Sequence, residues 1–179
     1  MAILSTAAGR LAAAAAVAAL MAAAPGAAAQ PPQFDESQVK AAFLFNFMKF
    51  VEWPSPDPRS RPLVICVAGP DDVRNALAAI VKQAPATAGL AVRPLTDGDD
   101  PRACHSVFIA ASEARRTAEV VERVAGAAVL TVGETSSFLN EGGLIRFYVS
   151  ENRLRFQIDP VGARVAGLRV SAQLLSLGR

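Results

Sequence analysis

The stretch Gln38–Pro54, QVKAAFLFNFMKFVEWP, carries much of the aromatic surface in this sequence of 179 residues. It holds four of the nine phenylalanines and the only tryptophan, Trp53. Apolar residues recur at helical spacing, which predicts a helix that stops at Trp53-Pro54, because a proline disfavours helical geometry in the residue before it. The stripe expected to pack on the rest of the fold consists of Val39, Phe43, Phe47 and Phe50.

This predicted helix is apolar on more than one side, which is typical of a helix that is buried on two sides or forms part of an interface. A domain of about 150 residues buries only about 70% of its chain surface, so one helix can hardly hide every aromatic ring. We therefore assign Phe45, Met48 and Trp53 to a candidate dimer or partner surface. Either Asp35 or Ser37 is suited to cap the helix. The residues expected on its solvent side are Lys40, Asn46 and Lys49.

Residues 1–29 have the pattern of a cleaved secretory signal peptide. The run Leu11–Ala24 is apolar and rich in alanine, and Ala27-Ala28-Ala29 supplies the small residues that precede a cleavage site. A membrane anchor is the weaker interpretation, because the apolar run is shorter than the ~18–20 residues that span a bilayer. The next residue is Gln30 and not a cysteine, so nothing indicates a lipoprotein.

The predicted mature chain, Gln30–Arg179, has a length that suits one domain. The formal net charge of the whole sequence is +2, and no block of basic residues is present, which argues against nucleic acid as a partner. No second apolar run reaches the length of a membrane span, so we expect an exported, soluble product.

Downstream of the aromatic stretch, short apolar runs alternate with helical patterns. The predicted strands are Leu63–Ala68, Leu90–Leu95, Cys104–Ala110 and Ala128–Val132. A helix over Val73–Lys82 follows the first strand, and a helix capped by Ser112 follows the third. Ala118, Val121 and Val124 form the expected inward stripe of that second helix. The order β-α-β-β-α-β is typical of a sheet that is covered by helices.

The last third of the chain predicts an antiparallel hairpin, because two alternating runs meet at Ser150-Glu151-Asn152. The side chains expected to face the core are Ile145, Phe147, Val149, Leu154, Phe156 and Ile158, with Leu144, Arg146 and Tyr148 on the opposite side of the first run. A short helix over Pro160–Gly167 and a final apolar turn capped by Ser171 follow; the turn carries Leu174, Leu175 and Leu177. The predicted fold class is α/β: a single-domain sandwich with a mixed sheet of about six strands and helices on both faces.

Two cysteines, Cys66 and Cys104, lie in the predicted mature chain. In an oxidising compartment, an even pair favours a disulfide, which could add roughly 4 kcal/mol of stability in the chain-entropy model. Free buried thiols remain an alternative. Metal binding is less favoured, because the only histidine, His105, together with two cysteines makes a poor ligand set.

No combination of residues forms a recognisable catalytic set. Cys104 and His105 are neighbours on a predicted strand, so their side chains point to opposite faces, and a structural role for His105 is favoured. There is no G-x-G-x-x-G sequence and no P-loop, so no nucleotide cofactor is expected. From the residues alone, we predict an exported, non-enzymatic α/β protein without cofactors.

Two clusters of charged residues, one acidic and one basic, can be interpreted either as ordinary solvated surface or as a binding site. The residues Asp97, Asp99 and Asp100 lack the spacing of a calcium loop, which favours a solvated loop. The arginines of the hairpin, Arg146, Arg153 and Arg155, either form a ligand or partner patch or keep a sheet edge from aggregating.

Beyond these patterns, six segments resemble the YfiR family, and together they cover nearly the whole predicted mature chain in order. They are KAAFLFNFMKFVEWP (Lys40–Pro54), VICVAGPDDV (Val64–Val73), CHSVFIAASE (Cys104–Glu113), LTVGE (Leu130–Glu134), GGLIRFYVSENRLRFQID (Gly142–Asp159) and AGLRVSAQLLSLG (Ala166–Gly178). The resemblance implies a compact α/β sandwich that dimerises and has no catalytic activity of its own.

The resemblance also implies a function. The best-known members of the YfiR family are described as periplasmic repressors that act on the periplasmic sensor domain of a membrane-bound diguanylate cyclase. An outer-membrane lipoprotein with a peptidoglycan-binding domain can sequester the repressor. Cyclic di-GMP output, biofilm formation and motility then respond to the state of the envelope or to its redox state. An alternative is a periplasmic small-molecule binding module that has no cyclase partner.

For individual residues, the resemblance places family cysteines at Cys66 and Cys104, in agreement with the expected disulfide. Some members have a second cysteine pair toward the C-terminal half, which this chain lacks, so switching through two bridges is not expected. A small-molecule pocket has been proposed for some members near the C-terminal segment. The corresponding candidate ligand residues are Arg164 and Arg169.

Overall fold

The computed structural model describes residues 35–54, 62–85 and 89–178, all of which belong to one unit, Asp35–Arg179. The predicted signal peptide, residues 1–29, lies outside the described residues.

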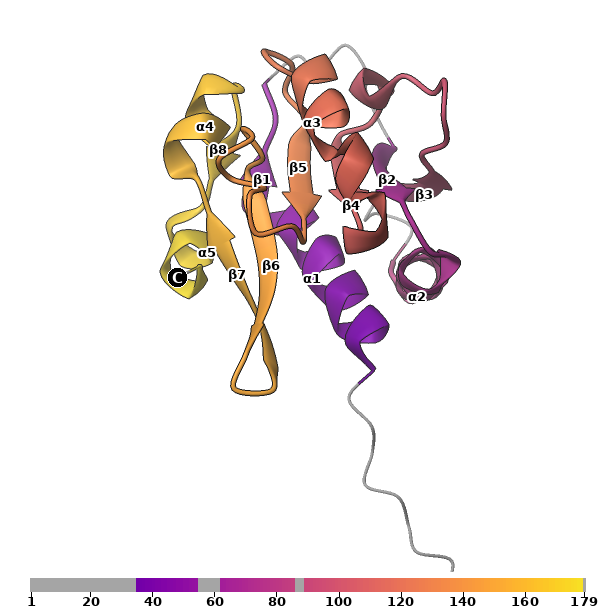
Figure 1. The fold of residues 1–179 in the computed structure, drawn as a ribbon. Coiled ribbons are helices and arrows are strands. Elements are labelled where there is room, and N and C mark those ends of the chain that lie inside the picture. The colour runs from indigo at the N-terminus through magenta and orange to yellow at the C-terminus, as the bar shows by residue number, and fades with distance from the viewer. Residues whose placement is uncertain (1–34, 55–61, 86–88, 179) are drawn as a thin grey trace, which may run out of the picture. The chain divides into compact units, whose positions relative to one another are not determined.

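Helix α1 (Glu36–Phe50) is formed by the aromatic stretch that opens the predicted mature domain (Figure 1). Asp35 caps it, because its carboxylate accepts hydrogen bonds from the backbone N–H groups of Ser37 and Gln38. The chain leaves helical geometry at Val51 and enters the short strand β1 (Val51–Glu52) before Trp53-Pro54. The predicted helix is confirmed, but it ends at Phe50, three residues before the predicted stop at Trp53-Pro54, because Val51 and Glu52 pair with β8 as a strand.

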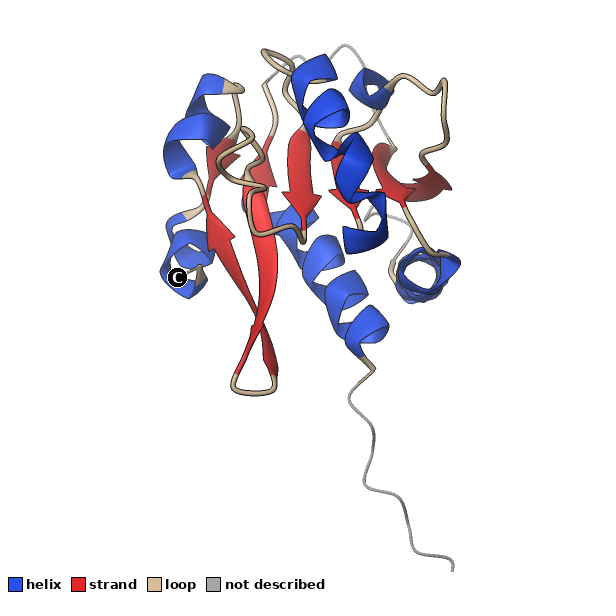
Figure 2. Cartoon of the chain, viewed as in Figure 1, coloured by secondary structure: helices blue, strands red, loops and turns tan. Residues whose placement is uncertain are grey.

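A six-stranded mixed sheet forms the centre of the fold (Figure 2). Its strands are β2 (Leu63–Ala68), β3 (Leu90–Pro94), β4 (Ser106–Ile109), β5 (Leu130–Gly133), β6 (Ile145–Ser150) and β7 (Arg153–Ile158). The spatial order is β3-β2-β4-β5-β6-β7; the first five strands are parallel, and β7 pairs antiparallel with β6. The predicted class, a mixed α/β sheet with a closing hairpin, is confirmed.

The remaining helices and short strands complete the unit. They are α2 (Asp71–Gln83), η2 (Pro101–Ala103), η3 (Ala111–Glu113), α3 (Ala114–Arg123), α4 (Pro160–Val165), β8 (Arg169–Val170) and α5 (Ala172–Leu177). Strand β8 pairs antiparallel with β1, so the C-terminal segment is joined to the end of α1. Ser171 caps α5 as predicted, since its hydroxyl accepts from the N–H of Leu174.

Both faces of the sheet are buried, which explains why its parallel strands are almost continuously apolar. In β4, Phe108 points into the core on the side of α1 and α2, whereas Val107 and Ile109 point into a second core on the side of α3. Alternate residues of β2 divide in the same way, with Cys66 on the α3 side. In Figure 1, α3 accordingly covers one face and α1 the other.

Gly142 and Gly143, which precede the hairpin, are each required to be glycine for a different structural reason. Gly142 has a φ of 91°, a conformation that a residue without Cβ adopts at little cost. Gly143 and Gly133 lie against opposite sides of the buried Phe138 ring, and a Cβ at either glycine would overlap that ring. Gly142 therefore allows the turn, and Gly143 together with Gly133 leaves room for the Phe138 ring beside β5.

The predicted cap of α3 is wrong, and its predicted stripe is confirmed at two of three positions. Ser112 lies in η3, and α3 begins after Glu113 with no side-chain cap. Ala118 is exposed, and the buried side of the helix is formed by Thr117, Val120 and Val121. Val121 and Val124 lie in the core beneath α3 as predicted, whereas Ala118 does not.

The hairpin forms over the predicted residues but differs from the prediction at two positions. Val149 is 58% exposed, because the β6–β7 turn projects beyond the ends of the other strands (Figure 1). Leu144, expected to face solvent, is buried, and its N–H donates to the Thr131 hydroxyl. In α5, Leu174 is buried whereas Leu177 is 62% exposed.

Candidate partner-binding surface

The fully buried side of helix α1 shares only Phe47 with the predicted stripe. Its fully buried residues are Ala41, Leu44, Phe47 and Met48. Met48 is 5% exposed, so it contributes to the core, and we leave it out of the proposed partner surface. Val39, Phe43 and Phe50 are only partly buried at the margin of that core. The buried stripe is rotated around the helix because α2 as well as the sheet packs against α1.

Aromatic rings join α1 to the hairpin. The Phe47 ring centroid lies 5.8 Å from that of Phe147 in β6 and 5.1 Å from that of Phe156 in β7. Phe43 contacts the same two rings, at 5.9 and 5.4 Å. Such pairs add roughly 0.5–1.5 kcal/mol each beyond the area that they bury. The predicted packing of Phe43 and Phe47 on the sheet is confirmed.

Phe45 lies at the border between core and solvent. It is partly buried against the main core, and the Lys49 ammonium lies 4.2 Å from its ring centroid. A cation at this distance is attracted to the face of the ring. Because Phe45 is only partly buried, it stays in the proposed surface.

Trp53 is held in place by His105, the residue that precedes strand β4. Its indole Nε1 donates a hydrogen bond to the backbone oxygen of His105 at 3.2 Å, and the two rings meet edge to face. His105 is 1% exposed, and its Nδ1 accepts from the N–H of Val64 at 2.9 Å. His105 thus links β1, β2 and β4, as expected of a structural histidine.

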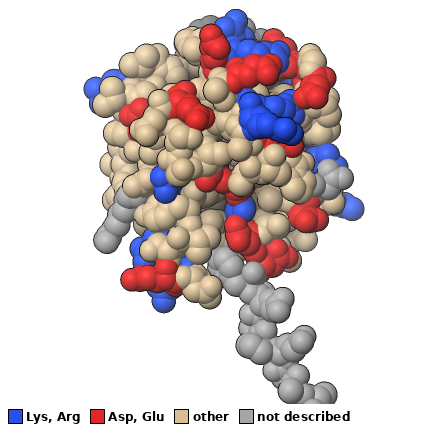
Figure 3. Space-filling model, in the orientation of Figure 1, with Lys and Arg blue, Asp and Glu red and all other residues tan. Residues whose placement is uncertain are grey.

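A groove of about 680 Å³ separates the exposed sides of α1 and α2. Its lining residues are Gln38, Val39, Ala42, Phe43, Asn46, Ala76, Ala79, Ile80 and Gln83. None of them is charged; apolar side chains alternate with three carboxamides that can donate and accept hydrogen bonds. In contrast, the face in Figure 3 shows acidic and basic side chains interspersed. Because the groove is uncharged and lies on the exposed side of α1, we take it as the candidate site.

Lys40 was expected at the solvent side of α1 but lies mostly buried. Its ammonium forms an ion pair with Glu134, which follows β5, and a second one with Glu36 at 2.6 Å. Glu134 also accepts from the N–H of Ala111 at 2.7 Å, so it joins α1 to the ends of two strands. Burial alone would lower the pKa of Lys40, but the hydrogen bonds to Glu134 and Glu36 outweigh it and raise that pKa above 10.5.

This ion pair predicts a loss of stability at alkaline pH. Because the pKa of Lys40 is higher in the folded chain than in the unfolded one, its contribution is complete below pH 10.5 and declines as the pH rises through the folded-state pKa. Urea unfolding at about pH 9 and about pH 11 should show a larger decrease for the wild type than for the double variant K40M/E134Q, which has no Lys40 ammonium to titrate. An equal decrease in the free energy of unfolding of both proteins would contradict the claim that the Lys40 ion pair stabilises the fold.

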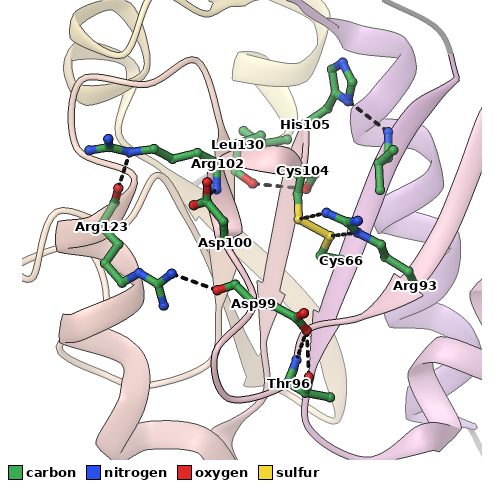
Figure 4. The surroundings of a disulfide bond; sticks show 12 residues. Cys66, Arg93, Thr96, Asp99, Asp100, Arg102, Cys104, His105, Arg123 and Leu130 are labelled. Carbon is green, nitrogen blue, oxygen red and sulfur yellow. Dashed lines mark hydrogen bonds between the residues drawn. A yellow bond between two sulfur atoms is a disulfide. The ribbon is translucent and has the colours of Figure 1, made fainter. Parts of the chain in front are cut away.

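The predicted disulfide is present between Cys66 in β2 and Cys104, which immediately precedes β4 (Figure 4). Both cysteines are 0% exposed and belong to the core beneath α3. With Cys104 bonded, a Cys–His nucleophile is not available in this state. The described residues contain no group of three or more His, Cys, Asp or Glu residues that could hold a metal ion.

The charged clusters form local interactions. Asp99 accepts from the N–H and hydroxyl of Thr96, Asp97 pairs with Arg116 at 3.0 Å, and Asp100 caps η2. These contacts fit the expected loop.

In the hairpin, Arg146 donates to the backbone oxygen of Ser136 at 3.1 Å, and Arg155 pairs with Glu151 at 3.0 Å. Arg153 is exposed. These contacts orient two of the three arginines along the sheet, and a role for them as a ligand patch stays a prediction.

Arg164 and Arg169 lie on separate elements. Arg164 is exposed on α4, and Arg169 is exposed on β8, where it pairs with Glu52 of β1 at 2.7 Å. Neither lines the groove between α1 and α2. A depression of about 400 Å³ between α3 and α4 includes Val165, the neighbour of Arg164, but neither arginine lines it. Their role in ligand binding stays a prediction.

Within the residues that the structure describes, no helix has the length and apolar character needed to cross a bilayer. Comparison with curated proteins gave no match. The comparison with protein families did: residues 37–179 match the model described as YfiR/HmsC-like. This region extends from the first turn of α1 to the end of the chain and includes the disulfide, the hairpin and the groove. Since the match covers well over half of the sequence, the chain belongs to the YfiR/HmsC-like family.

Proposed function

We propose that this protein is a periplasmic inhibitory binding protein that lowers cyclic di-GMP production by an inner-membrane diguanylate cyclase. The observation that carries the proposal is the family match over residues 37–179. In general terms, this family supports a periplasmic regulator of a diguanylate cyclase, and it is regulatory and not catalytic. The finer parts of the proposal are binding to the cyclase's periplasmic sensor domain, export by a signal peptide at residues 1–29, a homodimer, and sequestration by an outer-membrane peptidoglycan-binding lipoprotein.

A non-covalent repressor must bind one conformation of the cyclase more tightly than the other, since only differential affinity shifts a conformational equilibrium. The exposed side of α1 is suited to this contact. It offers an uncharged groove close to Phe45, a side chain that is only partly buried, and another side of the same helix is packed in the core. Trp53 belongs to the proposed surface as an anchored side chain at the end of that helix.

Deleting the gene should raise the cellular concentration of cyclic di-GMP, because the cyclase would then lack its repressor. Quantification of the dinucleotide by mass spectrometry in wild-type and deletion strains measures this effect. A plasmid copy should return the concentration to the wild-type level. An unchanged concentration in the deletion strain would contradict the proposed function.

The groove offers a matched pair of variants to test its role. Ala79 lines the groove on α2, whereas its neighbour Ala78 is also exposed but is not among the lining residues. Ala79→Arg should place a charged side chain in the groove and fail to lower cyclic di-GMP in the deletion strain, while Ala78→Arg should lower it as the wild type does. Both should fold, since surface substitutions usually change stability by about 0.5 kcal/mol or less. Full repression by Ala79→Arg would place the contact elsewhere.

A second candidate function is a periplasmic small-molecule binding module without a cyclase partner. The size and lining of the α1–α2 groove favour it, because small-molecule sites are mostly apolar depressions of roughly 300–1,000 Å³ with a few polar groups. A thermal-shift screen separates the two functions, since a ligand that binds only the folded state raises the melting temperature. A ligand that stabilises the wild type and Ala78→Arg, but not Ala79→Arg, would support this function if gene deletion leaves cyclic di-GMP unchanged.

A further inference from the structure

Strand β7 forms one edge of the six-stranded sheet and, among the described strands, pairs with β6 alone (Figure 1). The loop between these strands consists of Glu151 and Asn152, both with positive φ, as in a type I′ turn. The residue pair that closes such a loop is hydrogen-bonded, and bonded and non-bonded pairs alternate from there. The backbone N–H and C=O of Arg155 therefore point toward β6, whereas those of Leu154 and Phe156 point away from it, to the open edge.

This open edge is available for pairing. Within residues 35–54, 62–85 and 89–178, no backbone group of a loop or helix forms a hydrogen bond with the outward groups of Leu154 and Phe156. A row of such groups along a sheet edge accepts a further extended strand, whose main chain supplies the missing partners.

A depression of about 370 Å³ lies beside the edge. It is bounded by the hairpin, α1 and the end of α5, and its lining residues are Phe43, Tyr148, Leu154, Arg155, Phe156, Ser176 and Leu177. Five of these seven residues are aromatic or leucine, so the depression suits an apolar side chain. Leu177, which is 62% exposed, would be covered by such a side chain.

The charges of the hairpin determine which strand fits this edge. Successive residues of a strand point to opposite faces of the sheet, so Arg153 and Arg155 share one face and Leu154 and Phe156 share the other. Arg155 pairs with Glu151 inside the hairpin, whereas Arg153 is exposed. Opposite charges across neighbouring strands are favourable, and like charges are unfavourable. The edge therefore fits a strand that alternates acidic residues, next to the arginines, with apolar residues, next to the depression.

We propose that the open edge of β7 binds an extended acidic segment of another protein by strand addition, with carboxylates beside Arg153 and Arg155 and an apolar side chain in the depression. A second copy of this chain is not the occupant, because pairing of two β7 edges would bring the arginines of both copies together. Arginines that only keep an edge from aggregating would not account for the aromatic depression beside it. This surface differs from the α1–α2 groove, although Phe43 lines both, and the proposal does not depend on a cyclase.

Three peptides labelled with fluorescein through a neutral linker test the proposal by fluorescence anisotropy with the purified protein. They are the acidic hexapeptide Glu-Val-Glu-Val-Glu-Val, its counterpart with lysine in place of glutamate, and the acidic hexapeptide with methylated backbone nitrogens. The acidic peptide should bind saturably. The basic and the N-methylated peptides should each bind at least about tenfold more weakly, because one reverses the cross-strand charges and the other cannot donate to the edge. No saturable binding of the acidic peptide, or equal binding of either control peptide, would overturn the proposal.

Two further measurements locate the bound peptide. Amide hydrogen exchange should become slower at Leu154 and Phe156 when the acidic peptide is bound, but not at Arg155, whose N–H is already bonded to β6. Arg153→Glu should weaken binding of that peptide at least about fivefold. The matched variant Arg115→Glu makes the same charge change at an exposed residue of α3 and should bind within about twofold of the wild type. Equal weakening in both variants, or slower exchange only outside β7, would overturn strand addition at this edge.

Discussion

Phe47→Ala should lower the free energy of unfolding by about 3–5 kcal/mol, the range measured for removal of a fully buried phenylalanine. Phe47 is 1% exposed and contacts the rings of Phe43, Phe147 and Phe156. Truncation removes the ring at the point where α1 packs on the hairpin, and rigid neighbours on both sides limit collapse of the cavity. A domain of this size is usually stable by only 5–15 kcal/mol, so the loss is a large share of the total. Urea unfolding followed by circular dichroism measures it.

Phe45→Ala is the matched control, because it removes the same side chain from the same helix at a partly buried position. It should cost less than half as much as Phe47→Ala, since the Phe45 ring already contacts solvent and the exposed Lys49. If both variants lose the same amount of stability, α1 does not divide into a core side and a contact side, and the proposed partner surface loses its basis.

Removal of the disulfide in the double variant C66A/C104A should lower the free energy of unfolding by about 4 kcal/mol. The cysteines are separated by 38 positions, and cross-linking a loop of that length removes about this much chain entropy from the unfolded state. Because both side chains are buried among apolar residues, alanine fits their surroundings without burying a polar group. Urea unfolding of the oxidised wild type and of the variant measures the difference.

Dithiothreitol provides the control for this second prediction. Complete reduction should bring the wild type close to the variant in stability, and the variant itself should not respond. A variant as stable as the oxidised wild type would show that the cross-link contributes little beyond the core around it.

The central elements of the fold could be predicted because their signals are local. Leu63–Ala68 is continuously apolar and forms β2 over the predicted residues, since a strand buried on both faces needs apolar side chains at every position. The two hairpin strands follow from alternation on either side of a turn in which Glu151 and Asn152 have positive φ. Two cysteines in a chain that is predicted to be exported were enough to favour the disulfide.

The orientation of α1 could not be predicted from aromatic residues alone. Ala41, Leu44 and Met48 also have helical spacing, but the larger phenylalanines favoured another stripe. Packing of α2 against α1 decided between the two stripes, and periodicity within one helix does not contain that information. Lys40 illustrates the consequence. It lies on the side of the smaller residues and is buried with Glu134, a partner 94 positions away in the sequence.

Other features of the site depend on contacts between distant segments. The β1–β8 pair consists of two residues on each strand and is too short to leave a pattern. The depression beside β7 exists only because the end of α5 lies next to the hairpin, and the groove exists only where α1 and α2 lie side by side. Alternation identified the arginines of β7 but not the depression next to them.

The most direct test of the account is the cyclic di-GMP concentration in a strain that lacks the gene and carries either the full chain or a version without residues 1–29. The account predicts that the full chain lowers the concentration to the wild-type level, because the repressor reaches the periplasmic sensor domain of the cyclase. The version without residues 1–29, present in equal amount, should leave the concentration at the elevated level of the deletion strain. Equal repression by both versions, or no elevation after deletion, would contradict the claim that this protein represses a diguanylate cyclase from the periplasm.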